Sequence, residues 1–480
     1  MKKVVKIALV IGSIVSLVGC KGNDEVTLNI ISMNDTHGAL IETHASAGLI
    51  KGASYIERIK NENKKGTIIL SAGDMYQGTA VSNMEYGNTM IECMNALEFD
   101  AMTVGNHEFD WGEEIIKNHH DGNKENGEAK YPYLACNIFY SNNTEDTSDD
   151  TKVDWCQDYA VIQKQKVKVG VIGWISETCE EDISEPIVKN FSFHEPLSIL
   201  EETSKKLRDD GCDIIIAMGH EGATLNQSIM SFPEESKVDL IINGHSHTYY
   251  TSTNGVPSIQ SGSSLAHIAN TTIKYNKKTK EVIEITPYQE KITSEMQESE
   301  TIKKILDSRL ENYQYLFEEI TKASMNLTSS KVGQWVSETI KKATGSDVGI
   351  VNSGGIRAAA FPISKGESIN EDRMWMLMPF DNEINTCYLT GKQVKSLKNN
   401  KDGFVFDFAY KTTQFEDEKL YKVAACDYIF NKTDNIFLSG KDIEETKLLV
   451  RDVIILDLKE WGKVNREWDA SKSLLTKLEY

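Results

Sequence analysis

The sequence predicts an α/β fold over about residues 26–287, where short apolar runs alternate with longer amphipathic stretches. The short runs are rich in Ile, Val and Leu and end in Gly- or Asn-containing turns, as strands do. Segments 48–60 and 197–207 carry apolar residues at helical spacing and are expected to be helices. At 40% apolar residues in a chain of 480, the composition is sufficient for ordinary buried cores.

The amino-terminal segment predicts export. Lys2, Lys3 and Lys6 precede an apolar run over residues 7–19, which is shorter than the ~20 residues that span a bilayer. A transmembrane anchor is therefore the weaker interpretation, and residues 1–19 are expected to be a signal peptide. The small residue before Cys20 resembles a bacterial lipobox, which implies a lipidated Cys20, a tether over 20–25 and an extracytoplasmic position on the cell membrane.

The net charge and the cysteine spacing argue against several classes of partner and of metal site. The formal net charge is −20, which argues against a nucleic-acid polymer as partner. The cysteines after Cys20 show no Cys-x-x-Cys spacing, which argues against a zinc-thiolate site and a disulfide framework. A disulfide bond between Cys136 and Cys156 remains an alternative in an oxidising compartment. A site for an anionic ligand in so acidic a protein would need the sign of its charge reversed locally, and divalent cations would do so.

Potential metal ligands follow five of the apolar runs. They are Asp35 and His37 in 30–38, Asp74 in 68–74, Asn106 in 102–110, His220 in 214–222, and His245 with His247 in 240–247. Carboxyl ends of neighbouring strands meet at one edge of a sheet, so these side chains are expected to converge. Carboxylate, imidazole and amide ligands suit Mn²⁺, Zn²⁺, Co²⁺ or Mg²⁺. The pattern is that of a two-metal phosphoesterase.

A bridging Asp74 would divide the ligands between two ions. One ion would take Asp35, His37, Asp74 and His247, and the other would take Asp74, Asn106, His220 and His245. Each ion keeps open positions for water and phosphate, as a catalytic site requires. Two such ions roughly 3.5–4 Å apart lower the pKa of a water, orient it for in-line attack and neutralise phosphoryl charge.

His107 follows a predicted ligand directly and is the candidate for protonating or stabilising the leaving group. Asp110 is placed to accept a hydrogen bond from its imidazole and to fix the tautomer. A single Gly-His pair is more often a capped turn, and the argument rests on the conjunction: five of the ten histidines fall at these strand-end positions. The other five are expected to be structural or exposed: His44, His119, His120, His194 and His267.

The blocks Asn-Asp-Thr-His-Gly (34–38), Gly-Asn-His-Glu-Phe-Asp (105–110) and Gly-His-Ser-His (244–247) resemble the calcineurin-like metallophosphoesterases. The likeness is closer to the secreted 5′-nucleotidases and UDP-sugar hydrolases, and it covers about residues 26–440. It implies a four-layered αββα sandwich over 26–293 that holds both metals, with His107 and Asp110 as the catalytic pair. A related branch, the 2′,3′-cyclic phosphodiesterases with 3′-nucleotidase activity, usually has Asn where this chain has Asp110, which favours the 5′-nucleotidases.

The rest of the chain predicts a second unit. An amphipathic, charged stretch over 294–320 is expected to be an interdomain helix, and 321–480 a smaller α+β substrate-binding domain. The block 351–357 is similar to the family's substrate motif and nominates Asn352, Gly354, Gly355 and Arg357 as substrate-binding residues. The glycines permit close backbone approach, and the Arg357 guanidinium is a forked phosphate donor.

The second domain also departs from the family. The resemblance implies a base held between two aromatic rings, and Phe437 and Phe404 are the nearest candidates. The glycine-rich turn that normally carries one ring reads Lys-Thr-Asp-Asn-Ile-Phe (432–437) here, with its glycines absent. Either Phe can equally be a core residue. Residues 441–480 are expected to include a terminal helix packed on this domain.

The residues and the resemblance together indicate a membrane-anchored hydrolase that releases phosphate from nucleoside 5′-monophosphates, with di- and triphosphates or UDP-sugars as further substrates. This activity would serve nucleoside and phosphate salvage. One alternative is a 2′,3′-cyclic-nucleotide 2′-phosphodiesterase and 3′-nucleotidase. Another is a surface nucleotide-binding or adhesion protein without turnover. Neither the ions bound nor the oligomeric state follows from the sequence.

Overall fold

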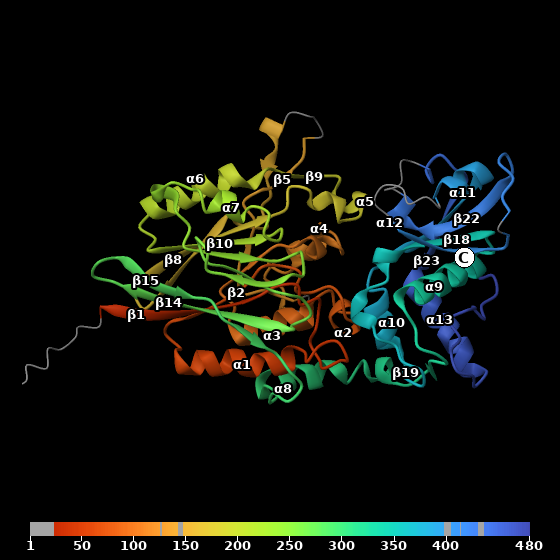
Figure 1. Ribbon diagram of the computed structural model, residues 1–480, viewed down its shortest axis with the longest axis horizontal. Coiled ribbons are helices and arrows are strands. Elements are labelled where there is room, and N and C mark those ends of the chain that lie inside the picture. The colour runs from red at the N-terminus through yellow and green to blue at the C-terminus, as the bar shows by residue number, and fades with distance from the viewer. Residues whose placement is uncertain (1–23, 125–126, 143–146, 398–404, 413, 431–435) are drawn as a thin grey trace, which may run out of the picture.

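The computed structural model describes residues 24–480 except 125–126, 143–146, 398–404, 413 and 431–435 (Figure 1). Cys20, the signal peptide over 1–19 and Phe404 lie outside the described residues, so the expectations about them stay predictions. Within the described ranges, none of the helices has the length and apolar character needed to cross a bilayer.

Two sheets form the body of the first half of the chain. The first sheet has the strand order β15-β14-β1-β2-β3-β4, and β16 also pairs with β14. Its strands are β1 Glu25–Met33, β2 Thr67–Ser71, β3 Ala101–Thr103, β4 Tyr133–Leu134, β14 His267–Asn276, β15 Glu281–Thr286 and β16 Gln289–Lys291. From β1 through β4 the neighbouring strands run parallel, so their carboxyl ends lie at one edge.

The second sheet has the order β12-β13-β11-β10-β8-β7. Its strands are β7 Tyr159–Lys164, β8 Val167–Ile175, β10 Ile214–His220, β11 Leu240–Asn243, β12 Tyr249–Ser252 and β13 Ser258–Ser261. Strands β8, β10, β11 and β13 are parallel and almost continuously buried, as expected for strands covered on both faces, and β8, β10 and β11 are rich in apolar residues.

Helices cover the outer face of each sheet. One apolar core lies between the sheets and contains Leu28, Leu70, Val169 and Ile216. Two further cores lie outside them, one under α1 Leu49–Glu62, α3 Asn88–Leu97 and α8 Glu300–Leu310, and one under α6 Pro196–Asp209 and α7 Asn226–Ile229 (Figure 1). The predicted four-layered αββα sandwich is confirmed, and the helices expected at 48–60 and 197–207 are α1 and α6.

The connection to the second unit is shorter than predicted. The helix expected over 294–320 consists of α8 followed by the 3₁₀ turn η6 Gln314–Phe317. Ile302 and Leu306 of α8 pack into the core of the first unit, whereas Leu316 belongs to the core of the second. The amphipathic stripe was therefore correctly located, but its apolar residues serve two different cores.

The second unit is built on a five-stranded sheet with the order β21-β18-β22-β20-β23. Its strands are β18 Val348–Asn352, β20 Glu383–Thr390, β21 Phe406–Tyr410, β22 Leu420–Cys426 and β23 Lys441–Leu449. Helices α9 Ser329–Thr344 and α13 Val450–Lys463 supply much of its core. The terminal helix expected within 441–480 is α13, and it follows an additional strand, β23.

Short elements connect these layers. The remaining helices are α2 Ala80–Asn83, α4 Glu113–Asn118, α5 Glu185–Val188, α10 Glu371–Leu377, α11 Gly391–Leu397 and α12 Asp427–Phe430. The remaining strands are β5 Ile138–Tyr140, β6 Thr151–Lys152 and β9 Phe191–Phe193, which form a small sheet, and β17 Thr321–Lys322 with β19 Ser368–Ile369. All seven described cysteines are buried and free, so the Cys136–Cys156 bridge does not form in this structure.

Asp372, in the first turn of α10, makes the stability of the second unit depend on pH. Burial raises the pKa of this carboxyl from 3.8 to about 6, with Arg373 opposing the rise. A folded pKa above the unfolded value means that ionisation destabilises the fold, progressively from about pH 4 to pH 6. Asp372→Asn should therefore increase the free energy of unfolding by ~2–3 kcal/mol at pH 8 and by much less at pH 4.5. Urea unfolding at both pH values measures this difference, and an equal effect at both would contradict it.

Candidate functional site

The predicted ligands lie where strands end. Asp35 and His37 follow β1, Asp74 follows β2, and Asn106 follows β3, all in the first sheet. His220 is the last residue of β10, and His245 and His247 follow β11, both in the second sheet. The two sheets bring these strand ends to one edge of the sandwich. The sequence therefore located the edge correctly.

Most of these residues have an unusual backbone conformation. Five of the seven predicted ligands lie in the left-handed region: Asp35 (φ 49°), His37 (φ 49°), Asp74 (φ 55°), His245 (φ 74°) and His247 (φ 54°). Residues other than glycine rarely adopt positive φ, and such strain persists mainly where surrounding contacts impose it. Its concentration at one edge indicates a site that is built for a function.

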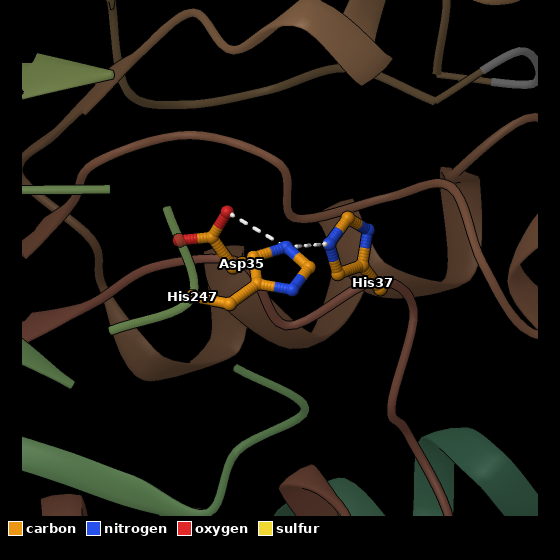
Figure 2. Close-up of side chains that lie close together, drawn as sticks. All are labelled: Asp35, His37 and His247. Atoms are coloured by element: carbon orange, nitrogen blue, oxygen red, sulfur yellow. Dashed lines mark hydrogen bonds and ion pairs between the residues drawn. The ribbon is translucent and has the colours of Figure 1, made fainter. Parts of the chain in front are cut away.

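Asp35, His37 and His247 form the first group (Figure 2). The Nε2 atoms of His37 and His247 are 2.9 Å apart, and the His247 Nε2 is 3.4 Å from Oδ1 of Asp35. The Asp35 carboxylate also accepts hydrogen bonds from the backbone N–H of His245 at 3.0 Å. Three donor atoms from two segments distant in sequence thus converge within the reach of one cation.

Asp74, Asn106, His220 and His245 form the second group. The His220 Nε2 is 3.2 Å from Oδ2 of Asp74 and 3.1 Å from Oδ1 of Asn106. Nδ1 of His245 approaches the same Asn106 oxygen at 3.0 Å. Ligand atoms of Asp35, Asp74 and His220 lie within 4.8 Å of one another, so the two groups adjoin at Asp74.

The donor set fits divalent metal ions. It consists of carboxylate, imidazole and amide atoms, with no thiolate. Nδ1 of His37 donates to the backbone oxygen of Gln77 at 3.2 Å, and Nδ1 of His220 donates to the oxygen of Ala72 at 2.7 Å. Both rings therefore present an unprotonated Nε2 to the site when they are neutral, as metal-binding histidines do. The predicted ligands of both ions converge around Asp74, and one close group joins His107 to His37 and Asp74, so the division of the ligands between two ions stays a prediction.

Electrostatics couple the two groups. Burial lowers the pKa of His220, but the neighbouring charge of Asp74 outweighs it and raises the pKa to about 10. Burial raises the pKa of Asp74, but His220 and His107 lower it well below its ordinary range. Burial lowers the pKa of His37. A cation that enters between His220 and Asp74 would replace the imidazolium proton, so metal binding should release protons.

Glu108 supports the ligand turns and was not anticipated from the sequence. Its carboxylate accepts hydrogen bonds from the backbone N–H groups of Asp74 (2.8 Å), Met75 (2.9 Å) and Gly105 (2.8 Å). A Cβ at Gly105 would lie 2.3 Å from Oδ1 of Asp74, which explains the glycine. Burial raises the pKa of Glu108 to about 7. Its adjacency to Asn106 and His107 was the available signal.

His107 and Asp110 are in contact. Nδ1 of His107 donates to Oδ2 of Asp110 at 2.8 Å, and the backbone N–H of His107 donates to Oδ1 of Asp74 at 2.9 Å. Burial lowers the pKa of His107, but the charges of Asp110 and Asp74 raise it more, so that it lies above its ordinary value. The ring also stacks on Phe380 of the second unit, with centroids 5.5 Å apart.

A cavity of about 560 Å³ joins the two units at this edge. The first unit lines it with predicted ligands and with His107 and Asp110, and the second lines it with Asn352, Gly354, Gly355 and Arg357. The Arg357 guanidinium lies over the Phe380 ring, 5.5 Å from its centroid. The predicted substrate motif therefore faces the predicted metal ligands across one space.

The prediction that the Phe437 ring contacts a substrate base is wrong in this structure. Phe437 is fully buried and stacks on Phe430 in the core of the second unit, with centroids 4.7 Å apart. Because no part of its ring reaches the cavity, it cannot contact a base there. The described aromatic side chains that line the cavity are instead Trp111, Phe380 and Tyr428.

Direct contacts hold the units together around the cavity. Nδ2 of Asn83, at the end of α2, donates to the backbone oxygen of Pro379 at 2.8 Å. The Tyr428 hydroxyl of α12 donates to the backbone oxygen of Glu181 at 3.4 Å, and α5 and α12 lie near each other in Figure 1. The segment after β8 also brings Asp182 to 3.4 Å from Nε2 of His245. No motif in the sequence marked Asp182.

Family models match both parts of the chain. The calcineurin-like phosphoesterase model matches residues 28–249, and the 5′-nucleotidase C-terminal domain model matches residues 304–410. The chain is a calcineurin-like phosphoesterase with a 5′-nucleotidase C-terminal domain. This family uses two divalent metal ions, in agreement with the ligand groups of the phosphoesterase domain.

Curated relatives match at moderate identity. Endonuclease YhcR of Bacillus subtilis is 24% identical over 438 residues, which are 82% of this chain and 34% of that protein. The 5′-nucleotidase of Homo sapiens is 29% identical over 238 residues, 46% of this chain and 38% of that protein. The chain thus spans about a third of the length of these relatives.

Solved structures match the fold of both domains. The 5′-nucleotidase precursor from Thermus thermophilus superimposes with a TM-score of 0.74 at 20% identity, covering 91% of this chain and 97% of that one. A 5′-nucleotidase from Candida albicans superimposes with a TM-score of 0.68 at 12% identity, covering 90% and 98%. The two-domain arrangement of this chain is therefore shared with these proteins.

Replacing Glu108 should weaken metal binding. Glu108→Gln substitutes an N–H₂ group for one acceptor oxygen, so at least one of the three clamped N–H groups loses its partner. Because the clamp positions Asp74, the affinity for Mn²⁺ should fall about 10- to 100-fold. Titration followed by calorimetry measures this, with Glu114→Gln on the exposed face of α4 as a control for the same chemical change. Equal Mn²⁺ affinity of the two variants would show that Glu108 does not position Asp74 for metal binding.

Proposed function

We propose that the protein is a metal-dependent phosphohydrolase that releases inorganic phosphate from nucleoside 5′-monophosphates. One observation carries the proposal: the strained ligand edge, His107 and Arg357 share a single cavity between the two domains. A volume of about 560 Å³ is in the range of small-molecule sites. The family membership supports a phosphoester substrate.

Divalent ions held by the two ligand groups would neutralise the phosphate and acidify a water molecule. Arg357 suits the phosphoryl oxygens, because its guanidinium offers paired N–H donors in a fixed geometry. Burial lowers the pKa of Arg357, while the charges of Asp74 and Asp110 oppose this. An arginine guanidinium keeps its proton in proteins. In the reaction a water oxygen bonds to phosphorus, and the bond from phosphorus to the ester oxygen breaks.

His107 is the proposed proton donor to that ester oxygen. Its Nδ1–H is engaged by Asp110, which leaves Nε2 for the leaving group. The raised pKa of His107 favours the protonated ring near neutral pH, as a general acid requires. Asp110 then stabilises the imidazolium and holds the ring in place. Phosphate and a nucleoside with a restored hydroxyl are the products.

The charges around the cavity favour monophosphates over polyphosphates. Among the described lining residues, Arg357 is the only Arg or Lys, whereas Asp182, Asp381 and Asp427 add carboxylates beyond the catalytic set. Asp381 is paired with Arg451 at 2.6 Å and Asp182 lies 3.4 Å from Nε2 of His245, so of these described residues Asp427 is the carboxylate without a cationic partner that a second phosphate would meet. Neutral hydroxyls and amino groups of a nucleoside suit such acceptors better.

A location outside the cytoplasm, with a lipid on Cys20, remains part of the proposal. It rests on the amino-terminal sequence, because Cys20 lies outside the described residues. Such a protein would supply nucleosides and phosphate at the cell surface. Trp111, Phe380 and Tyr428 are the proposed base contacts in place of Phe437.

Removal of the His107 ring should separate catalysis from metal binding. His107→Ala is expected to lower kcat for AMP by about 100- to 10,000-fold, the range for loss of a general acid. Metal content by elemental analysis should stay at the wild-type value, because His107 is not assigned as a ligand. His267→Ala, on β14 away from the cavity, serves as the matched control. Wild-type turnover by His107→Ala would remove its assigned role.

Substrate preference tests the charge argument and the related activity together. With Mn²⁺ added, kcat/KM for AMP should exceed that for ADP and UDP-glucose at least tenfold, because the second phosphate meets the Asp427 carboxylate. Phosphate release and coupled assays of each product provide the measurement. Hydrolysis of 2′,3′-cyclic AMP without hydrolysis of AMP would instead establish the cyclic phosphodiesterase.

A further inference from the structure

Gln77 lies in the turn that links the ligand edge to α2. It follows Asp74 by three residues and lines the cavity between the domains. Its backbone oxygen accepts the hydrogen bond from Nδ1 of His37 at 3.2 Å. The next residue, Gly78, has φ 151°, and a Cβ there would lie 2.4 Å from the backbone oxygen of His37. The backbone of Gln77 is therefore fixed relative to a predicted metal ligand.

The Gln77 side chain is buried without hydrogen-bond partners. Its exposed fraction is 1%, and within the described part of the chain neither Nε2 nor Oε1 makes a hydrogen bond. Among the described buried amides, Gln77 alone lacks partners at both atoms, whereas Asn243 and Gln260 each lack a partner at one atom. Two others are fully engaged. Asn34 donates to Asp35 and Gly262 and accepts from Ser261, and Asn137 donates to two backbone oxygens and accepts from a backbone N–H.

Such a contrast needs a reason, because a buried polar group with no partner destabilises a fold. Packing alone does not supply one, since a methionine fills the same volume without unmet donors. Gln77 lines a cavity shared with His107, His247 and Arg357. A ligand or a water molecule that enters this space would supply the partners.

The surroundings indicate which ligand chemistry fits. Phosphoryl oxygens are strong acceptors, and the Gln77 Nε2 carries two donors. A lysine here would bring a further positive charge beside the two proposed metal ions and Arg357, and would oppose metal loading. A neutral amide donates a hydrogen bond without adding charge, which suits a site that already concentrates cations.

We propose that Gln77 is a substrate-binding residue whose Nε2 donates a hydrogen bond to a nonbridging oxygen of the phosphoryl group. This inference rests on the proposed function of the cavity and assigns it a further contact. Gln77 and Arg357 then hold the phosphoryl group from the phosphoesterase domain and from the 5′-nucleotidase C-terminal domain, respectively. Gln77 contributes to binding and orientation and takes no part in proton transfer.

The test measures binding of a phosphate mimic without turnover. Orthovanadate is titrated calorimetrically into Mn²⁺-loaded wild-type protein, Gln77→Met and Gln77→Glu, and metal content and Tm are recorded for each. Gln77→Met should weaken vanadate binding about tenfold, with metal content unchanged and Tm equal or higher, because an unpaired polar group is removed. Gln77→Glu should weaken it further through charge repulsion. Gln289→Met, in β16 away from the cavity, should match wild type in vanadate affinity, with a lower Tm because the three hydrogen bonds donated by Nε2 are lost.

The outcomes separate this inference from the proposed function. Vanadate affinity of Gln77→Met within twofold of wild type would overturn the assignment, as would a lower Tm with unchanged affinity, which marks a structural role. Absence of vanadate binding by the wild-type protein would overturn it as well. Weakened vanadate binding in a protein that does not hydrolyse AMP would support Gln77 as an oxyanion contact and reject only the nucleotidase activity.

Discussion

The Asp74 carboxylate is the contact on which the ligand edge depends. It follows β2 of the first sheet, lies 3.2 Å from His220 of the second sheet, and accepts the backbone N–H of His107 at 2.9 Å. A carboxylate that is 1% exposed must be neutralised, because an unpaired buried charge is very costly. Asp74 therefore links the two sheets electrostatically, and a cation can take over the role of the His220 proton.

In this site, the residues with a strained backbone differ from the residue that stabilises the strained turns. The strained residues are the ligands themselves, whereas Glu108 holds the turns after β2 and β3 through three backbone hydrogen bonds. Each ligand residue can therefore point its side chain in the direction that a cation requires. The hydrogen bonds to Glu108 offset the free-energy cost of the strained backbone. The same turn that carries Asp74 continues through Gln77 into α2, where Asn83 contacts Pro379 of the second domain. Ligand geometry and domain docking thus share one short segment.

The second domain completes the cavity on the side opposite the ligands. Phe380 packs on His107 and beneath Arg357, so the segment 379–381 positions both the proposed acid and the phosphate-binding guanidinium. Arg451 of α13 secures this block: it donates to the backbone oxygens of Pro379 and Phe380 and pairs with Asp381. The carboxyl-terminal region, whose sequence carried no motif, consequently supports the site from behind.

Much of this site could be predicted from the sequence because each predicted ligand follows its strand directly along the chain. Asp35, Asp74 and His220 each follow an apolar run, and parallel strands of one sheet must end together, so α/β architecture and convergence followed from pattern alone. Glu108 and Gln77 were missed although they sit inside the same blocks. Their roles depend on which N–H groups surround one side chain and on the absence of partners around the other.

Only the tertiary structure decided how the two domains meet. Phe437 is buried because Phe430 packs against it, and Asp182 lies close to His245 because of the path of the loop after β8. Neither contact produces a periodic pattern in the sequence. The amphipathic stripe over 294–320 likewise could not reveal that it serves two cores. The sequence by itself determined the ligands and the strand ends, because local spacing encodes both. Long-range packing determined the wall of the cavity, because contacts between distant segments have no spacing to read.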